Sequence, residues 1–241
     1  MAVEPLISWF EGTNTDQAAV TGVINYGTVE SDSESNHKVF FVWNNKNGTT
    51  DVPTMEEVSF TTRDRDGGNG DTAGMIVEAV RDNWMNVRVD SLNEQTFTAV
   101  GRGGSKPVGT NGSTTNPKAA TAVVWSANTP YTVGQYIKPT GANGFIYRVT
   151  KGGTSGGTQP TWSTSAGNVV SDGTVEYATV AIVITPAAFE ILGVANTVAP
   201  DGSNATSSGG NFIKLTVYGF VPPTASSGKN EFLQRISYKF V

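Results

Sequence analysis

Apolar runs and strict alternation of apolar and polar residues dominate the chain, and both patterns are typical of β-strands. Clusters of Gly, Asn and Asp separate the runs, for example NNKNG at residues 44–48 and ASSGK at residues 225–229, and indicate turns. One short helix is conceivable, around residues 73–82. The pattern predicts an all-β protein, with its clearest strands at residues 38–44 (KVFFVWN), 57–62, 84–90 (WMNVRVD), 95–100, 212–221 (FIKLTVYGFV) and 231–241.

The strand pattern stops at residues 101–121 (GRGGSKPVGTNGSTTNPKAAT), a polar stretch typical of a linker. An aromatic-rich segment follows, and then strands of the earlier type resume. Two layouts fit this order: a module inserted into a β-sandwich, or three domains in a row. We favour the insertion because residues 185–241 alone carry too few strands for a stable sandwich. The expected parts are residues 1–104 (first part of the sandwich), 105–122 (linker), 123–183 (inserted module) and 184–241 (second part of the sandwich).

The charge distribution argues against several classes of partner. The net charge is -5, only 15% of the residues are charged, and Lys and Arg are scattered singly. Nucleic acids and anionic membrane surfaces both require clustered cations, so neither is an expected partner. No apolar stretch is long enough to span a bilayer, and the first residues, MAVEPLISWFEG, lack the pattern of a signal peptide. We therefore expect no membrane association and no export by a signal peptide.

Catalytic chemistry finds little support in the sequence. The chain has no Cys and one His, His37, which lies in the polar run VESDSESNHK, where a solvated loop is the default state. A Ser-His-Asp triad would need His37 in a pocket beside a nucleophile, and no G-x-S-x-G turn is present. Nothing singles out a pair of carboxylates for glycoside hydrolysis. The sequence therefore predicts a protein that is not an enzyme, with no catalytic residue and no cofactor.

The loop DRDGGNGD at residues 64–71 resembles a cation-binding loop at first sight. An EF-hand needs oxygen ligands at positions 1, 3 and 5, Gly at position 6 and Glu at position 12. Counted from Asp64, the sixth position is Asn69 and the twelfth is Met75, so the pattern fails. We expect a flexible hairpin loop and no metal site, with Asp64, Asp66 and Asp71 as weak candidates for Ca²⁺ ligands.

One segment carries a family resemblance. Residues 125–177 contain W-x-x-N-x-x-Y-x-x-G-Q-Y, then G-F-I-Y-R-V-T, then G-T-S-G-x-T-Q-P-T-W, then V-x-D-G-T-V-x-Y. This order resembles the small carbohydrate-binding-like β-module of tailed-phage structural proteins, and is similar in outline to chitin-binding modules of secreted hydrolases. The flanking motifs FFVWNN, VSFTTRDRDGG, WMNVRVDSL and FLQRISYKFV resemble an Ig-like β-sandwich protein of phage particles. The resemblance implies an Ig-like sandwich with this module inserted.

Aromatic residues are the main chemical feature of the module. Seven rings fall within about fifty residues, and a domain that small needs most of them for its core. The sharper hypothesis is that one or two rings stand exposed as a platform for the apolar face of a sugar. Trp162 and Tyr131 are the best candidates, because each lies close to a proline in a polar loop. The seven rings are Trp125, Tyr131, Tyr136, Phe145, Tyr147, Trp162 and Tyr177.

These observations lead to an expected function. The resemblance implies a structural component of a bacteriophage particle, associated with the tail or baseplate and exposing a glycan-binding-like module. Expected partners are other virion proteins, further copies of the chain in a symmetric homo-oligomer such as a trimer, and a host surface glycan. The expected location is the virion, assembled in the host cytoplasm and released by lysis. The alternatives are a capsid decoration protein and, in another class, a free carbohydrate-binding protein or the accessory part of a glycan-degrading enzyme.

Overall fold

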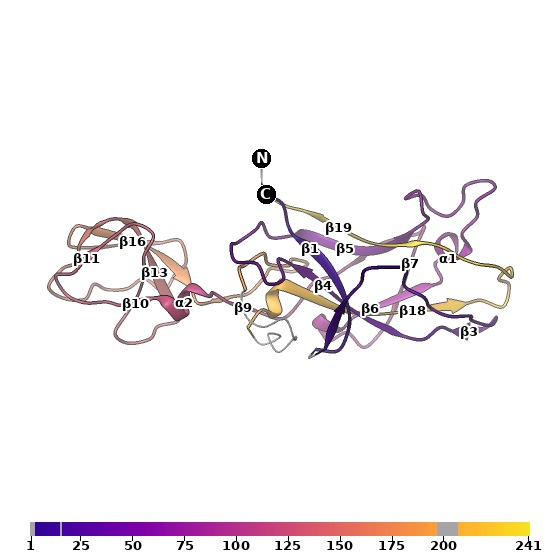
Figure 1. The fold of residues 1–241 in the computed structure, drawn as a ribbon, viewed down its shortest axis with the longest axis horizontal. Coiled ribbons are helices and arrows are strands. Elements are labelled where there is room, and N and C mark those ends of the chain that lie inside the picture. The colour runs from indigo at the N-terminus through magenta and orange to yellow at the C-terminus, as the bar shows by residue number, and fades with distance from the viewer. Residues whose placement is uncertain (1–2, 15, 197–206) are drawn as a thin grey trace. The chain divides into compact units, whose positions relative to one another are not determined.

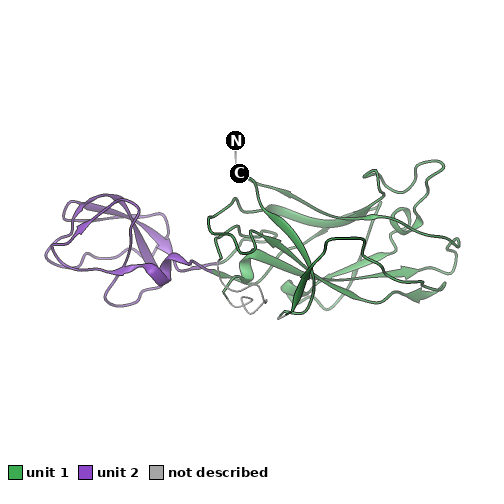
Figure 2. Cartoon of the chain, viewed as in Figure 1, with its two compact units in different colours: residues 1–114, 185–241 green, residues 115–184 purple. Residues whose placement is uncertain are grey.

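The computed structural model describes residues 3–14, 16–196 and 207–241. The chain forms two compact units, residues 1–114 with 185–241 (unit 1) and residues 115–184 (unit 2), coloured green and purple in Figure 2. Nearly all regular structure is β, as expected (Figure 1). The helix foreseen at residues 73–82 is the single turn α1, Glu78–Arg81, and a second short helix, α2, spans Lys118–Thr121. No helix in the described residues is long and apolar enough to cross a membrane.

A large antiparallel sheet forms one layer of unit 1. Its strands β4 and β18 have the bounds expected from the sequence, because apolar residues fill both faces of these two central strands. Strand β3 lies outside the linear strand order, because it pairs only with the last two residues of β18. The strand order is β2-β1-β4-β18-β6-β7, with β1 at Ile7–Gly12, β2 at Gln17–Ala19, β3 at Ser33–Glu34, β4 at Lys38–Asn44, β6 at Met85–Val89, β7 at Thr98–Val100 and β18 at Phe212–Val221.

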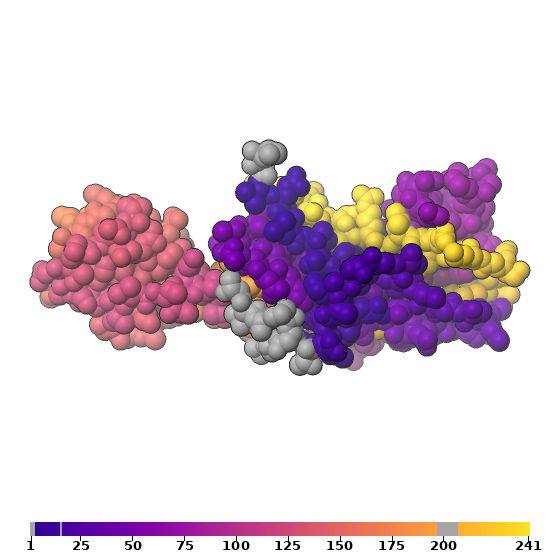
Figure 3. Space-filling model, in the orientation of Figure 1, coloured from indigo at the N-terminus to yellow at the C-terminus, as the bar shows by residue number. Residues whose placement is uncertain are grey.

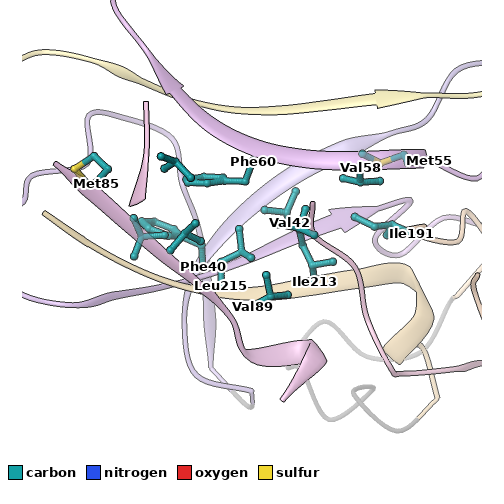
Figure 4. Packing of buried hydrophobic residues seen from close by; sticks show 14 residues of the cluster. Phe40, Val42, Met55, Val58, Phe60, Met85, Val89, Ile191, Ile213 and Leu215 are labelled. Atoms are coloured by element: carbon teal, nitrogen blue, oxygen red, sulfur yellow. The ribbon is translucent and has the colours of Figure 1, made fainter. Parts of the chain in front are cut away.

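A smaller sheet forms the second layer, in the order β19-β5-β8. Its strands are β19 (Leu233–Lys239), β5 (Glu56–Arg63) and β8 (Lys106–Pro107). Alternate side chains of both sheets meet in one core, as in a β-sandwich (Figure 4). Phe40 and Val42 of β4 and Leu215 of β18 face Val58 and Phe60 of β5, and all five are at most 1% exposed. The core of the sandwich is thus formed by apolar side chains at every second position of the strands.

Residues beyond unit 2 complete the sandwich. Strand β18 pairs with β4 on one side and β6 on the other, so the middle of the large sheet comes from the C-terminal part of the chain. Strand β19 pairs with β5 in the same way. Without residues 207–241 the large sheet would be split in two and the small sheet would keep only β5 and β8. Residues 115–184 therefore interrupt one folding unit.

The expected linker at residues 105–122 needs correction over its first half. Strand β8 pairs with β5, and Val108 is completely buried. The hydroxyls of Thr110 and Thr114 donate to Gly209 O (3.0 Å) and Asn211 Oδ1 (2.7 Å). Polar residues here are bonded to a segment almost a hundred positions later, so the stretch is held in unit 1. The connection itself is short: β9 (Thr114–Thr115) pairs with β17 (Val183–Ile184).

Buried asparagines hold the returning chain against the end of β4. Asn45 Nδ2 donates to Gly193 O at 2.8 Å, and Asn196 Nδ2 donates back to Asn45 O at 2.9 Å. Asn211, in the 3-10 helix η3 (Gly209–Asn211), donates to Val194 O at 2.7 Å. These three amides are at most 4% exposed. Asn45 O and Gly193 O also accept from Gly48 N and Val52 N, so the amides add further hydrogen bonds that fix the returning chain, and the buried amides are themselves satisfied.

Unit 2 is a small β-fold with its own core. Five strands form a sheet in the order β10-β12-β13-β16-β15, and β11 pairs separately with β14. The central strands β13 (Phe145–Lys151) and β16 (Val175–Ala181) point alternate side chains inward. The remaining strands are β10 (Val123–Val124), β11 (Pro130–Tyr131), β12 (Tyr136–Lys138), β14 (Gly153–Thr154) and β15 (Val169–Asp172).

Candidate functional site

Three aromatic rings of unit 2 form a contiguous group, which we call the Trp162 stack: Tyr147, Trp162 and Tyr177. The ring centroids of Tyr147 and Trp162 are 4.1 Å apart, and those of Trp162 and Tyr177 are 5.4 Å apart. Tyr147 and Tyr177 are completely buried, whereas Trp162 is partly exposed. The two tyrosines therefore form a rigid base on which the indole lies.

The strands explain why these rings meet. Tyr147 in β13 is opposite Thr179 in β16, and Val149 is opposite Tyr177, so all four side chains lie on one face of the sheet. Trp162 comes from the irregular segment between β14 and β15. Its neighbour Ser163 is held in place because Tyr147 Oη donates to Ser163 O at 2.6 Å. The site therefore combines a sheet face with a loop that is tied to it.

A buried carboxylate, Asp172, is hydrogen-bonded to the stack through the hydroxyl of Tyr177. Asp172 is 5% exposed, and its two oxygens accept three hydrogen bonds. Oδ2 accepts from Trp125 Nε1 at 2.7 Å and from Tyr177 Oη at 3.2 Å, while Oδ1 accepts from Gly156 N at 2.7 Å. The carboxylate thus joins β15, β16, the start of the unit and the loop that leads to Trp162. The motif V-x-D-G-T-V-x-Y contains this residue, but the sequence alone assigned it no role.

The tyrosines of the stack are held in their neutral form. Burial raises the pKa of Tyr147, against a smaller opposing effect of the hydrogen bond from Asn143 Nδ2. Burial also raises the pKa of Tyr177, and the negative charge of Asp172 adds to the effect. The neutral Tyr177 hydroxyl donates a hydrogen bond to Asp172. The network is therefore structural at neutral pH.

Trp162 meets the sequence-based expectation in part. Part of the indole is exposed, but Nε1 is buried and has no hydrogen-bond partner in the described part of the chain. The polar edge of the ring therefore points into the unit, and a ligand outside would meet carbon atoms only. A sugar can pack a C–H-rich face on such a surface without a polar contact to the indole.

Tyr131 does not meet the expectation of an exposed ring. It is 5% exposed, packs edge-on to Tyr177 with centroids 6.4 Å apart, and its Oη accepts a hydrogen bond from Ser126 N at 2.8 Å. The reason is strand alternation in β11, where Pro130 points outward and Tyr131 therefore points inward. The ring belongs to the core of unit 2.

The acidic loop of unit 1 is ordered by one of its own carboxylates. Asp64 is 6% exposed and accepts main-chain hydrogen bonds from Gly70, Gly68 and Asp66. These bonds, that from Gly70 above all, hold the pKa of Asp64 below its ordinary value. Asp71 instead lies 3.3 Å from Arg102. The expected flexible loop is thus a structured turn. In the residues that the structure covers, no three acidic or His side chains gather as a metal site.

Two further features of unit 1 lie outside the expected sites. His37 lies in an exposed loop, as expected, where it stacks on Tyr218 with centroids 4.5 Å apart and its Nε2 is 3.2 Å from Glu34 Oε2. An open cavity of about 400 Å³ lies beside Met75, Ile76 and the loop at residues 64–66. Neither feature has a nucleophile paired with a base.

No protein family model, curated protein or solved structure matches this chain.

Proposed function

We propose that the chain is a structural component of a bacteriophage particle, located at the tail or baseplate, and that unit 2 binds a glycan of the host surface. The observation that carries the proposal is a coincidence of boundaries. The segment with the phage-module resemblance, residues 125–177, falls within unit 2, residues 115–184. Its aromatic residues build both the core of that unit and the Trp162 stack.

The insertion supports the same proposal. Unit 2 leaves unit 1 and returns to it through paired segments, which is an arrangement suited to presenting a binding module from a carrier. A single exposed ring gives weak sugar binding at best. Several copies in a symmetric assembly would raise the overall affinity, because later contacts form within one complex.

Affinity electrophoresis of the full chain tests the glycan part. Native gels would contain chitin oligomers as a defined test sugar, or soluble cell-wall polysaccharide or lipopolysaccharide O-chains from a host of the phage. We expect retardation in at least one gel, its loss in Trp162→Ala, and its recovery in Trp162→Phe. Val133→Ala is the matched control, since Val133 is 67% exposed in the same unit and outside the stack. Equal migration of Trp162→Ala and the unsubstituted chain in every gel would remove the glycan role.

Labelling of particles tests the location. Gold-conjugated antibodies against unit 1 would be applied to purified particles of the phage that encodes the chain. Label on the tail or baseplate supports the proposal, while label on the head favours a capsid decoration protein. Absence of the chain from purified particles, with retardation intact, would favour a free carbohydrate-binding protein.

A further inference from the structure

The edges of the two sheets in unit 1 differ in length. The large sheet ends in β2 and β7, each of three residues, and the small sheet ends on one side in β8, a two-residue strand that contains Pro107. Short edge strands and proline are common ways to keep a sheet from adding strands. The fourth edge is β19, with seven residues. It is the one long edge strand in the described part of unit 1.

Among the residues that the structure describes, none pairs with the outer main-chain groups of β19. Strand β19 pairs with β5 alone, and no other main-chain hydrogen bond among the described residues involves residues 233–239. Tyr26 contacts this part of the chain through its side chain, since it stacks on Phe232 and accepts a hydrogen bond from Gln234. In the space-filling view the C-terminal segment, in yellow, lies on the surface along a margin of unit 1 (Figure 3). A row of donors and acceptors is therefore open to an added strand.

Exposed side chains of β19 carry positive charge, which favours an acidic partner. Ile236 and Tyr238 point inward and are only partly buried against the core. On the other face Leu233 is 46% exposed, and Arg235 and Lys239 are exposed as well. The strand has no carboxylate of its own. Lys239 contacts Glu57, but both side chains are 68% exposed, and such a pair contributes little.

We propose that the free edge of β19 binds an extended acidic segment of another protein of the particle as an added β-strand. Main-chain hydrogen bonds supply the affinity, and carboxylates at alternate positions lie beside Arg235 and Lys239 on the outer face. Apolar residues at the intervening positions cover the exposed parts of Ile236 and Tyr238. This site lies in unit 1 and is independent of glycan binding by unit 2.

The same cations disfavour a second copy of β19 as the partner. Pairing of two identical strands would bring two Arg and two Lys side chains onto one face, and like charges across a strand pair are destabilising. The register shift between Ser237 and Lys239 adds a further irregularity that a second β19 would have to match. The positive charges of Arg235 and Lys239 thus both disfavour pairing with a second β19 and favour an acidic strand.

Fluorescence anisotropy with a defined peptide tests the proposal on the full chain. The probe is labelled Ser-Val-Glu-Val-Glu-Val-Glu-Ser, and the comparison peptide has Lys in place of each Glu. We expect the acidic peptide to bind about tenfold more tightly than the basic one, and to weaken as salt is raised. Hydrogen exchange measured by mass spectrometry should show new protection of the amides in residues 233–239 and none in β2 or β7.

Charge reversal supplies the decisive comparison. Arg235→Glu with Lys239→Glu should invert the preference between the two peptides. The matched control, Arg148→Glu with Lys151→Glu, makes the same charge change on exposed positions of β13 and should leave the preference unchanged. Equal binding of both peptides, or acidic-peptide binding without protection of residues 233–239, would refute the proposal. Concentration-dependent protection of these residues without any peptide would refute it in favour of a second copy.

Discussion

Replacing Asp172 by Ala tests the idea that one carboxylate organises unit 2. The substitution removes the acceptor of three hydrogen bonds, from Trp125 Nε1, Gly156 N and Tyr177 Oη. An unsatisfied buried donor costs about 1–3 kcal/mol. The three share one site and partly relax together, so we expect a total loss on the order of 3–6 kcal/mol. A domain of about seventy residues has roughly 4–10 kcal/mol of stability, so the variant should lose a large share of the stability of unit 2.

The assay must separate the two units, because both contain tryptophan. Hydrogen exchange followed by mass spectrometry over a urea series reports β13 and β16 of unit 2 apart from β4 and β18 of unit 1. We expect the unit 2 midpoint to fall sharply in Asp172→Ala and the unit 1 midpoint to stay.

Two companion variants sharpen the result. Asp172→Asn keeps one oxygen acceptor and should lose about half as much stability. Glu176→Ala is the control, since Glu176 lies in the neighbouring strand and its pair with Lys151 is solvent-exposed; it should cost less than about 0.5 kcal/mol. A unit 2 midpoint in Asp172→Ala that equals that of Glu176→Ala would refute the reasoning.

Two further predictions concern pH and backbone contact. Burial raises the pKa of four tyrosines, so the folded chain keeps protons that the unfolded chain loses, and the free energy of unfolding should fall as pH rises above about 10. Absorbance at 295 nm should show these four ionising at higher pH in the folded chain than in urea; a single early step for all seven tyrosines would contradict this. Gly193→Ala should destabilise unit 1 by about 3 kcal/mol or more, because its Cβ would lie 2.2 Å from Val52 O; an unchanged urea midpoint would contradict it. The four tyrosines are Tyr26, Tyr147, Tyr177 and Tyr218.

Strand pattern predicted the sandwich well where apolar residues decide the structure. Residues 38–44 and 212–221 are strands with the expected bounds, because continuous apolar runs such as KVFFVWN fit a central strand with both faces covered. The helix at residues 73–82 shrank to one turn, since Gly74 and the β-branched residues disfavour a longer one.

Polar segments were harder to predict, because their partners lie far along the chain. Thr110 and Thr114 are bonded to residues of η3, and nothing in the composition of residues 105–115 distinguishes such bonded hydroxyls from those of a solvated linker. The buried role of Asp172 was missed for the same reason. An Asp-Gly pair between two strands indicates a turn, and the indole and hydroxyl that bind the carboxylate come from positions 125 and 177.

For Trp162 the sequence predicted the exposure of the ring but not its packing. Trp162 is partly exposed, as the polar loop around it indicates, but its contact with Tyr147 depends on a sheet face that the loop sequence does not reveal. For Tyr131 the neighbouring proline suggested exposure, whereas the alternation of β11 places the ring inside.

The paired connection between the units has a mechanical consequence. Thr114–Thr115 and Val183–Ile184 run side by side, and Asn116 N donates to Ile182 O at 2.7 Å just beyond them. Tension applied to the module is therefore divided between two backbones, and each carries half the load that a terminal tether would bear. One proteolytic nick in an exposed loop of the module would leave both fragments covalently joined to the carrier, so shedding the module requires two cuts.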